Sequence, residues 1–469
     1  MVSKDEWKEN SYRSYEVEDL DATWNLVQFV TESTFNDLPE DVIEKAKLQI
    51  LDCIGVTLAG LNHSISGIIE QYLKTVGGKR QATVIGLGLK APCPDVAWAN
   101  GSLGHALDFD DNSIDLPAAI HQTVTTLPAA MSVGEYRNVN GREMLLALVL
   151  GIEVGSKVDR AMGGHLRAWH GTGTFGTLAS AVAAGKLLEL SSEELEFALG
   201  AAMSMAAGLT VNFGTMMKPL HAGQASRNGV LAAMLVKGGL NSAKGVLEGK
   251  DGFAAVMGVH FDPEYLVRHL GNPWEIEDPG IHLKMYPSCM ATHAALDAAL
   301  KIEREYKPNP DEVSSVEVRS KKDLSDALIY NEPRTALEGK FSMQFCIAIA
   351  LLRGQATLEE FIDEEVRNTR IMKLMEKVKL LHDSKMEGRG VWSTHVKVAM
   401  ADGRVCEEMV EYPKGSKMKP MSLHEVKEKF RGCAGGVLPQ NRIDELMDII
   451  LRLEDIDDIS QLLRCSMRP

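Results

Sequence analysis

The sequence has no segment that could cross a lipid bilayer and no sustained run of basic residues. Its longest apolar candidate, residues 197–211, is shorter than the roughly 20 residues that a membrane-spanning helix needs. The net charge of -15, from 50 basic and 65 acidic residues, argues against nucleic-acid binding. The N-terminus is polar and acidic and lacks the apolar core of a signal peptide. These absences predict a soluble, cytoplasmic protein without membrane or nucleic-acid partners.

Paired cysteines are missing as well. Seven cysteines are scattered along the chain, and none stands in a CxxC motif or at a zinc-ligand spacing. Their odd number and wide spacing are typical of free thiols in a reducing compartment. Hydrophobic residues make up 45% and charged residues 25% of the 469 residues, close to the averages of globular proteins. The chain is long enough for two or three domains with a large core, and it has no internal repeat.

The first half of the chain is patterned as a series of helices. After Pro39, apolar residues recur at helical spacing as far as Leu61. Ser191 and Glu194 form a capping box at the start of another helix. Further helices are predicted at residues 143–158, 177–190, 192–209 and 222–237. Because many of these helices are rich in Ala and Gly, they can pack closely, and we expect an all-helical domain over residues 1–280.

The pattern changes after about Gly280. Residues 315–319 and 394–400 alternate with period two, as half-buried strands do. Asp402-Gly403, between the strand at 394–400 and a second predicted strand at 405–412, predicts a hairpin. Helical patterns lie between the strands, at residues 293–306 and 341–352. We therefore expect a smaller α+β domain over residues 281–421.

A capping box at Ser422 and Glu425 opens a further helical region that runs to about Leu463. We expect residues 422–469 to pack back on the first helical domain. The predicted fold class is thus mainly α, with a large all-helical domain and a smaller α+β lid domain.

The first segment that can carry chemistry is GHALDFDD, residues 104–111. His105 and Asp108 are three residues apart and would share one face of a helix. A carboxylate beside a histidine can fix its tautomer or act as a general base, although a solvated acidic helix end explains the same residues. A metal ion is disfavoured because no second His or Cys follows at ligand spacing. His121 lies after this segment and, taken alone, is typical of a structural histidine.

The second segment is HGTGTFG, residues 170–176, which precedes an apolar helix. It matches GxGxxG, but no convincing strand comes before it, which argues against a dinucleotide site. We interpret the segment as a loop at a helix start. Backbone N–H groups at Gly171, Thr172 and Gly173 would then suit a carboxylate or a phosphate.

Two more segments combine cations with histidines. Lys218 and His221 are three residues apart in a turn marked by Gly and Pro, where they can clamp an anion or be an exposed lysine and a capping histidine. Lys284, Cys289 and His293 lie within ten residues. A cysteine near a helix start can have a lowered pKa and act with a histidine as a nucleophile, or it can be a small buried residue.

Taken together, the segments GHALDFDD, HGTGTFGTLASAVAAGKLL, MKPLHAGQASRNG, KMYPSCMATHAALDAA and EGKFSMQF resemble the MmgE/PrpD family. The resemblance runs from about Trp24 to about Arg442. The family includes 2-methylcitrate dehydratase, cis-aconitate decarboxylase and iminodisuccinate epimerase. The resemblance implies an active site between the two domains, a homodimer, small di- or tricarboxylate substrates, and no obligatory metal or organic cofactor.

The resemblance also implies site residues. Asp108, His121, His170, Lys218 and Lys284 match family positions, although the spacing to His121 is longer here. Two further positions, one a match and one a departure, lie in the second half of the chain. Tyr330, in LIYNEP, matches a family tyrosine, and Cys289 stands where the decarboxylase branch carries a histidine. This departure counts against itaconate-type decarboxylation, although His293 lies one helical turn further on.

These residues suit proton abstraction next to a carboxylate. Removing the proton builds negative charge on the carboxylate oxygens, which Lys218, Lys284 and the 171–176 segment would stabilise. We expect His121 and His170 to act as base and acid, with Asp108 orienting one of them. His105, His221 and His293 complete the predicted set as substrate-binding residues.

The reaction that we expect first is dehydration by a lyase. An epimerase or racemase comes second, because the thiol of Cys289 can serve as one of two facing bases, and a decarboxylase comes third. The non-enzymatic alternative is a carboxylate-binding scaffold. It is disfavoured because polar groups gathered in an unused pocket cost stability.

Overall fold

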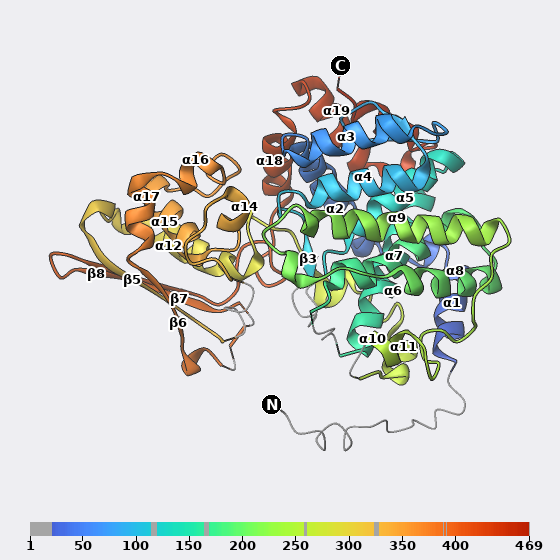
Figure 1. Ribbon diagram of the computed structural model, residues 1–469, viewed down its shortest axis with the longest axis horizontal. Coiled ribbons are helices and arrows are strands. Elements are labelled where there is room, and N and C mark those ends of the chain that lie inside the picture. The colour runs from blue at the N-terminus through green and yellow to red at the C-terminus, as the bar shows by residue number, and fades with distance from the viewer. Residues whose placement is uncertain are drawn as a thin grey trace.

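The structure is a computed structural model that describes residues 21–113, 120–163, 168–257, 260–322, 328–387, 389–390 and 392–468. The predicted mainly α fold with a smaller α+β domain is confirmed, since 58% of the chain is helical and the sheets are few and small. Two lobes lie side by side, one of helices alone apart from short strands and one with a sheet below its helices (Figure 1). The polar N-terminal segment 1–20 lies outside the described residues.

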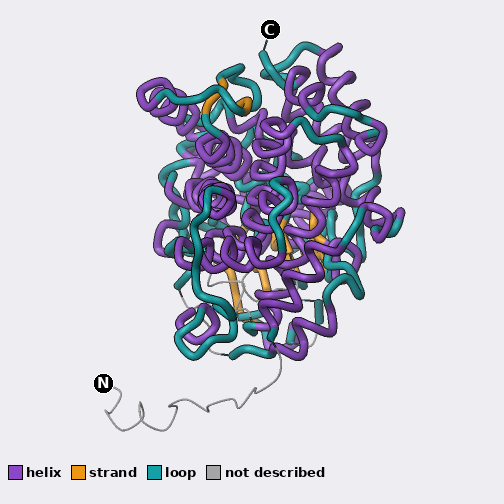
Figure 2. Tube along the Cα trace, turned by 90° about the vertical axis from the view of Figure 1, so that its right-hand side faces the viewer, coloured by secondary structure: helices purple, strands orange, loops and turns teal. Residues whose placement is uncertain are grey.

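The larger, helical lobe begins with eleven described helices and contains several two-residue strands. Its helices are α1 (Ala22–Glu32), α2 (Glu40–Gly60), α3 (Ile65–Val76), α4 (Cys93–His105), α5 (Thr123–Arg137), α6 (Gly141–Ala161), α7 (Gly171–Leu187), α8 (Ser192–Met205), α9 (Met217–Lys237), α10 (Phe253–Met257) and α11 (Pro263–His269). Its strands are β1 (Ala82–Thr83), β2 (Lys90–Ala91), β3 (Asn112–Ser113) and β4 (Ile281–His282). Seen from this lobe, the molecule presents almost only helices and loops (Figure 2).

Glycines let the helices of this lobe approach closely, as predicted. A Cβ added at Gly223 of α9 would lie 2.3 Å from the carbonyl oxygen of Trp98 in α4. One added at Gly229 would lie 2.4 Å from the Cβ of Ser180 in α7. Helix α9 is therefore packed closely against both α4 and α7, the helices that carry candidate site residues.

The smaller lobe packs helices on one face of a four-stranded sheet. Its elements are α12 (His293–Tyr306), β5 (Val313–Ser320), α14 (Ala336–Gly339), α15 (Met343–Arg353), α16 (Asp363–Val366), α17 (Thr369–Met375), β6 (Val378–His382), β7 (Thr394–Met400) and β8 (Val405–Val410). The strand order is β6-β5-β7-β8, with β6 parallel to β5 and the other pairs antiparallel. The predicted hairpin is confirmed, because Thr394 pairs with Val410 across the turn at Gly403.

The C-terminal helices α18 (Leu423–Ala434), α19 (Gln440–Leu451) and α20 (Ser460–Cys465) share the core of the helical lobe. Phe430 of α18 lies against α2, where a Cβ at Gly55 would meet its ring at 2.9 Å. The red C-terminal helices accordingly lie beside the blue N-terminal ones (Figure 1). The small lobe has a separate core. We propose residues 1–280, 281–421 and 422–469 as the division of the chain.

Most predicted elements are present, but several boundaries differ. Residues 171–176 form the first turns of α7 rather than a loop, because Gly173 and Gly176 allow close packing against neighbouring segments. Lys218 and His221 lie in the first turn of α9 rather than before it, and Pro219 is tolerated there. Helix α8 ends at Met205, short of the predicted residue 209. In the described part of the chain, no helix combines the length and apolarity needed to cross a membrane.

Candidate active site

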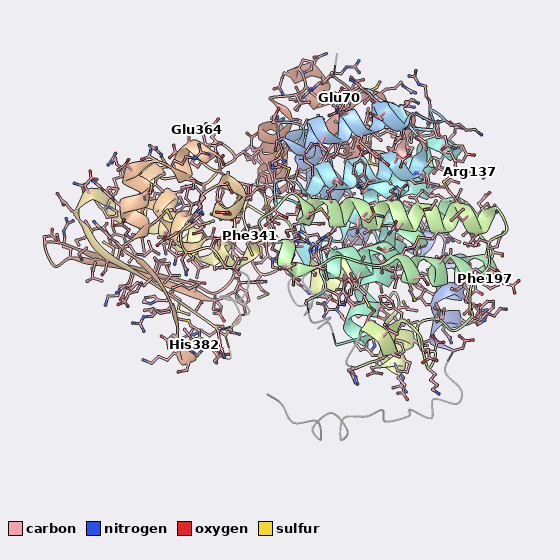
Figure 3. All side chains as sticks on the ribbon, viewed as in Figure 1. Glu70, Arg137, Phe197, Phe341, Glu364 and His382 are labelled. Atoms are coloured by element: carbon pink, nitrogen blue, oxygen red, sulfur yellow. The ribbon has the colours of Figure 1, made fainter. Side chains whose placement is uncertain are left out.

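Segments from both lobes meet at one place. The loop after α4, the start of α5 and the N-terminal turns of α7 and α9 come from the helical lobe. Residues 284–289 and the segment before α15, at the edge of the small lobe, lie against these four segments. Phe341 marks the junction of the lobes (Figure 3), and its ring centroid lies 5.3 Å from Lys218 Nζ. The structure thus brings residues that are far apart in the sequence into one buried cluster.

Asp108 lies at the centre of this cluster and is only 4% exposed. Its carboxylate forms an ion pair with Lys218, and Lys284 Nζ lies 3.3 Å from its Oδ2. Burial acts to raise the pKa of Asp108, but Lys218 and Lys284 outweigh it and hold this pKa well below its usual range. Asp108 is therefore an ionised carboxylate between two lysines.

Asp110 is the partner of two histidines. His105 Nδ1 lies 2.9 Å from both of its carboxylate oxygens, and His121 Nδ1 lies 2.9 Å from Oδ2. Despite burial, the two histidines hold the pKa of Asp110 well below its usual range. Because an ionised carboxylate only accepts hydrogen bonds, His105 Nδ1 carries the proton that it donates to Asp110. We assign the same tautomer to His121, whose Nδ1 faces this carboxylate. Each neutral ring then has its lone pair on Nε2.

The predicted pairing of His105 with Asp108 on one helix face is wrong. Helix α4 ends at His105, and Asp108 lies beyond it with a left-handed φ of 52°. The turn at Asp108 directs its carboxylate to the lysines and leaves Asp110 to orient the histidines. Sequence reasoning missed Asp110, although its place five residues after His105 in DFDD was a usable signal.

His121 and His170 are both neutral bases in this environment. Burial lowers the pKa of His121 to about 3. Burial, and then the charge of Lys218, lowers the pKa of His170 well below its usual range. The backbone N–H of His121 donates to Thr172 Oγ1 at 3.1 Å, and this bond joins the segment before α5 to the first turn of α7. The centroids of the His121 and His170 rings are 6.4 Å apart, and both rings lie near His105.

His221 continues the row of histidines. Its Nδ1 lies 3.2 Å from His170 Nδ1, so one of these nitrogens donates and the other accepts. Burial lowers the pKa of His221 to about 4. The N–H of Gly173, expected to bind an anion, instead donates to the His170 carbonyl at 2.8 Å. The amide of Gly173 is therefore used inside the helix.

Cys289, His293 and Tyr330 come from the small lobe. The expected lowering of the Cys289 pKa is wrong, because burial and then Asp108 raise the pKa of this thiol. His293 begins α12 and its Nε2 donates to the Ser288 carbonyl at 3.2 Å. Tyr330 donates from its hydroxyl to the Phe213 carbonyl at 3.2 Å, across the boundary between the lobes. All seven cysteines of the chain are free, as predicted.

Sequence models of two domains match the chain. The MmgE/PrpD N-terminal domain matches residues 25–266, and the MmgE/PrpD C-terminal domain matches residues 286–455. The chain belongs to the MmgE/PrpD family. In this MmgE/PrpD protein, Asp108, His121, His170 and Lys218 lie in the N-terminal match, whereas Lys284 lies between the two matches.

Several curated relatives align over most of this MmgE/PrpD chain. A cis-aconitate decarboxylase of Aspergillus terreus is 29% identical over 95% of this chain and 96% of its own length. The cis-aconitate decarboxylase of Mus musculus is 28% identical over 92% and 91%, respectively. The mitochondrial 2-methylcitrate dehydratase of Yarrowia lipolytica is 22% identical over 86% and 82%. The family resemblance seen in the motifs is thereby confirmed.

One group of side chains in this MmgE/PrpD site has the composition of a metal site. His105, Asp110 and His121 each offer a ligand atom, and these atoms lie within 4.8 Å of one another. The argument that no second histidine accompanies the first is therefore wrong, because the fold supplies His121. The same contacts are accounted for by two imidazole N–H groups that face one carboxylate, and the chemistry below is built on those bonds.

Proposed function

We propose that this protein is a lyase that acts on a small di- or tricarboxylate without a cofactor, and that its reaction is dehydration. The observation that carries the proposal is the ionised Asp108 between Lys218 and Lys284, beside the neutral His121 and His170. Two cations and two neutral imidazoles in one buried site suit removal of a proton next to a carboxylate. The lyase names of the relatives support the same class of reaction.

In the proposed reaction, His121 Nε2 takes the proton from the carbon next to a substrate carboxylate. Its low pKa makes it a weak base in the free protein, but a bound polycarboxylate brings negative charge that raises this pKa. Lys218 and Lys284 stabilise the charge that develops on the carboxylate oxygens. The negative charge of the bound polycarboxylate also raises the pKa of His170, which takes up a proton from solvent and gives it to the leaving hydroxyl. Water departs, an alkene remains, and His121 returns its proton to solvent.

Decarboxylation is the second candidate, because relatives that align over more than 90% of this chain carry the name cis-aconitate decarboxylase. In that reaction a carboxylate leaves as carbon dioxide, and the carbanion left behind takes a proton from an imidazole. Epimerisation is disfavoured by the state of Cys289. The thiol of Cys289 would be one of the two bases of such an epimerase, and its raised pKa makes it a poor proton donor and a poor source of thiolate.

The test is proton NMR of the purified protein with citrate, methylcitrate, cis-aconitate, malate and iminodisuccinate in separate samples in deuterated water. A new alkene formed with loss of water supports the proposal. Release of carbon dioxide without loss of water would show that the reaction is decarboxylation and not dehydration. Deuterium exchange without a net product, abolished by Cys289→Ala, identifies an epimerase. Binding of these acids without turnover or exchange overturns the enzymatic proposal in favour of the scaffold.

We also propose, from the sequence and the resemblance alone, that the protein works as a homodimer in the cytoplasm. Sedimentation of the purified protein tests the dimer, because a monomer at micromolar concentration contradicts it. The site described above is formed within one chain, so the proposed chemistry does not depend on this outcome.

A further inference from the structure

Three consecutive backbone carbonyls around Asp108 each accept a hydrogen bond from a different lysine. Lys340 donates to the Leu107 carbonyl at 2.7 Å, Lys284 to the Asp108 carbonyl at 2.9 Å, and Lys429 to the Phe109 carbonyl at 2.8 Å. The three lysines come from separate parts of the chain. Such a row of ammonium groups on one turn of backbone is not needed to form a helix or a sheet.

Two of these lysines also hold the loop that carries Lys284. Lys340 donates to the Pro287 carbonyl at 2.9 Å, and Lys429 donates to the carbonyl of Lys284 itself at 2.7 Å. Each ammonium group therefore joins the turn at Asp108 to the loop 284–287. One clamp is anchored in the small lobe, just before α15, and the other in α18.

The backbone at this point needs such support. Asp108 has a φ of 52°, in the left-handed region, which Asp adopts more readily than most residues but which is still uncommon for any residue other than Gly. Strained residues of this kind persist where their surroundings hold them in place, and they are frequent at functional sites. Here the left-handed turn is what directs the Asp108 carboxylate to Lys218.

The two clamping lysines are themselves fixed. Lys340 is 2% exposed, and its ammonium lies 5.3 Å from the centroid of the Phe361 ring. Lys429 Nζ lies 2.6 Å from Asp52 of α2 and 3.9 Å from the centroid of the Phe109 ring. Burial lowers the pKa of Lys340 to about 7, and the charge of Asp108 offsets it only in part.

We propose that Lys340 and Lys429 are positioning residues for the reaction, which hold the Asp108 turn and the Lys284 loop in register from the two sides. Neither lysine reaches the reacting atoms; each acts through Asp108 and Lys284. The inference rests on the proposed function for its kinetic consequence. Its structural consequence, a loosened Asp108 turn when either clamp is removed, does not depend on which acid is the substrate.

The chain offers a matched control. Lys186 also places its ammonium on three backbone carbonyls, those of Val30, Thr31 and Ser33 at the C-terminal end of α1, at 2.8, 3.0 and 2.8 Å, but far from the site. Lys340→Met, Lys429→Met and Lys186→Met thus remove the same kind of contact in different places. Two measurements are compared in the full-length protein: kcat and KM on the acid that the wild type turns over, and amide hydrogen exchange of residues 105–113.

We expect Lys340→Met and Lys429→Met to lower kcat by about 10²-fold with a smaller change in KM, since a small misplacement of reacting groups has that effect. Exchange of residues 105–113 should become faster in both variants. Lys186→Met should lose stability but leave kcat and this exchange within about threefold of the wild type. Lys429→Arg, which keeps the charge beside Asp52, should recover part of kcat and serves if the Met variants do not fold.

Unchanged kcat and exchange in folded Lys340→Met and Lys429→Met would overturn the inference, as would equal losses in Lys186→Met. A wild type that turns over none of the acids defeats the proposed function instead. In that case faster exchange of residues 105–113 in the two clamp variants alone still supports the positioning role, and unchanged exchange still overturns it.

Discussion

The three aspartates of DFDD do not share one protonation state, although they are neighbours. Asp108 and Asp110 are ionised because lysines surround the first and histidines the second. Asp111 accepts a hydrogen bond from the Thr123 hydroxyl, and burial raises its pKa to about 8. One short segment therefore supplies an anion for the lysines, an acceptor for the histidines and a neutral carboxyl group.

Exchanging Asp110 for Asn should disturb the tautomers of the histidines. An amide has one acceptor oxygen and an NH2 donor, so either both imidazole N–H groups share that oxygen, or one ring faces the NH2 group and moves its own proton to Nε2. If that ring is His121, it no longer presents a base to the substrate. We expect Asp110→Asn to lower kcat by about 10²- to 10⁴-fold. Asp111→Asn, the matched control, replaces a carboxyl group that is already neutral and should stay within about threefold. Equal losses in the two variants would contradict these roles.

Asp111 also predicts how stability depends on pH. Its pKa is about 8 in the folded protein, against 3.8 for an ordinary aspartate, so between these pH values the folded state holds a proton that the unfolded state has lost. The stability that this group provides is complete below about pH 4 and is lost as the pH rises towards 8. The advantage of Asp111→Asn in free energy of unfolding should therefore grow between pH 5 and 7, by up to about 1.4 kcal/mol per pH unit. Urea titrations at these pH values check it, and a constant difference contradicts the raised pKa.

Most residues of the buried cluster could be named from the sequence, because they stand in short motifs that combine His, Lys or Asp with Gly. His121 and Tyr330 could be assigned only through the family resemblance, since nothing in their local pattern separates them from structural residues. Lys429 has no local signal at all, because its partners Phe109 and Lys284 are brought to it by the fold. Contacts made only by tertiary packing are the part that sequence reasoning could not reach.

Helices α7 and α9 bring their first turns to the site, and glycine sets how closely they can approach. A Cβ on Gly173 would lie 2.2 Å from the Ala207 carbonyl oxygen and 3.5 Å from the Cβ of His221. This contact explains why GTGTFG is helical and not a phosphate-binding loop. The glycines serve helix packing, a use that the pattern GxGxxG does not distinguish.

A matched pair of glycine substitutions tests this explanation. Gly173→Ala should destabilise the protein by about 1–3 kcal/mol, because the added methyl group overpacks the start of α7 against the Ala207 carbonyl. It should also lower activity, because the start of α7, which follows His170, must shift. Gly67→Ala, in α3, meets nothing within 4 Å and should stabilise the protein by about 0.5 kcal/mol. Urea denaturation of both variants gives the comparison. A neutral Gly173→Ala would show that close packing is not the role of this glycine.

Elements with a clear period were predicted well, and those without one were not. The predicted helix 293–306 and strand 394–400 have the same bounds in the structure as α12 and β7. Strand β6 was missed because VKLLH does not alternate; it pairs through its backbone at the edge of the sheet. Its parallel pairing with β5 is a long-range contact that local sequence does not reveal.

The two ends of the described chain complete one core, in which α18 packs against α2. Phe430 is 1% exposed and lies against Gly55. Phe430→Ala should therefore lower the free energy of unfolding by about 3–5 kcal/mol. Leu423→Ala, in the same helix but 45% exposed, should change it by less than about 0.5 kcal/mol. Similar small effects in both would contradict the assignment of residues 422–469 to the helical lobe.

The arrangement of the whole molecule explains why the site is composite. Asp108, His121, His170 and Lys218 come from the helical lobe, Cys289 and Tyr330 from the small lobe, and Lys429 from the C-terminal helices. The change from helical spacing to alternation with period two after about Gly280 was enough to predict two kinds of domain. It was not enough to predict that a C-terminal lysine joins the loops of the site, because that contact exists only once both ends of the chain have packed together.

The most direct test of the proposed site compares the wild type with Lys218→Met in deuterated water, on the acid that the wild type converts. Lys218 is the ion-pair partner of Asp108 and lies at the centre of the cluster. Deuterium at the carbon next to the carboxylate, in substrate or product, is measured by NMR. We predict incorporation by the wild type and a loss of at least about 10²-fold in folded Lys218→Met. Incorporation at the wild-type rate by the variant would contradict the assignment of this site.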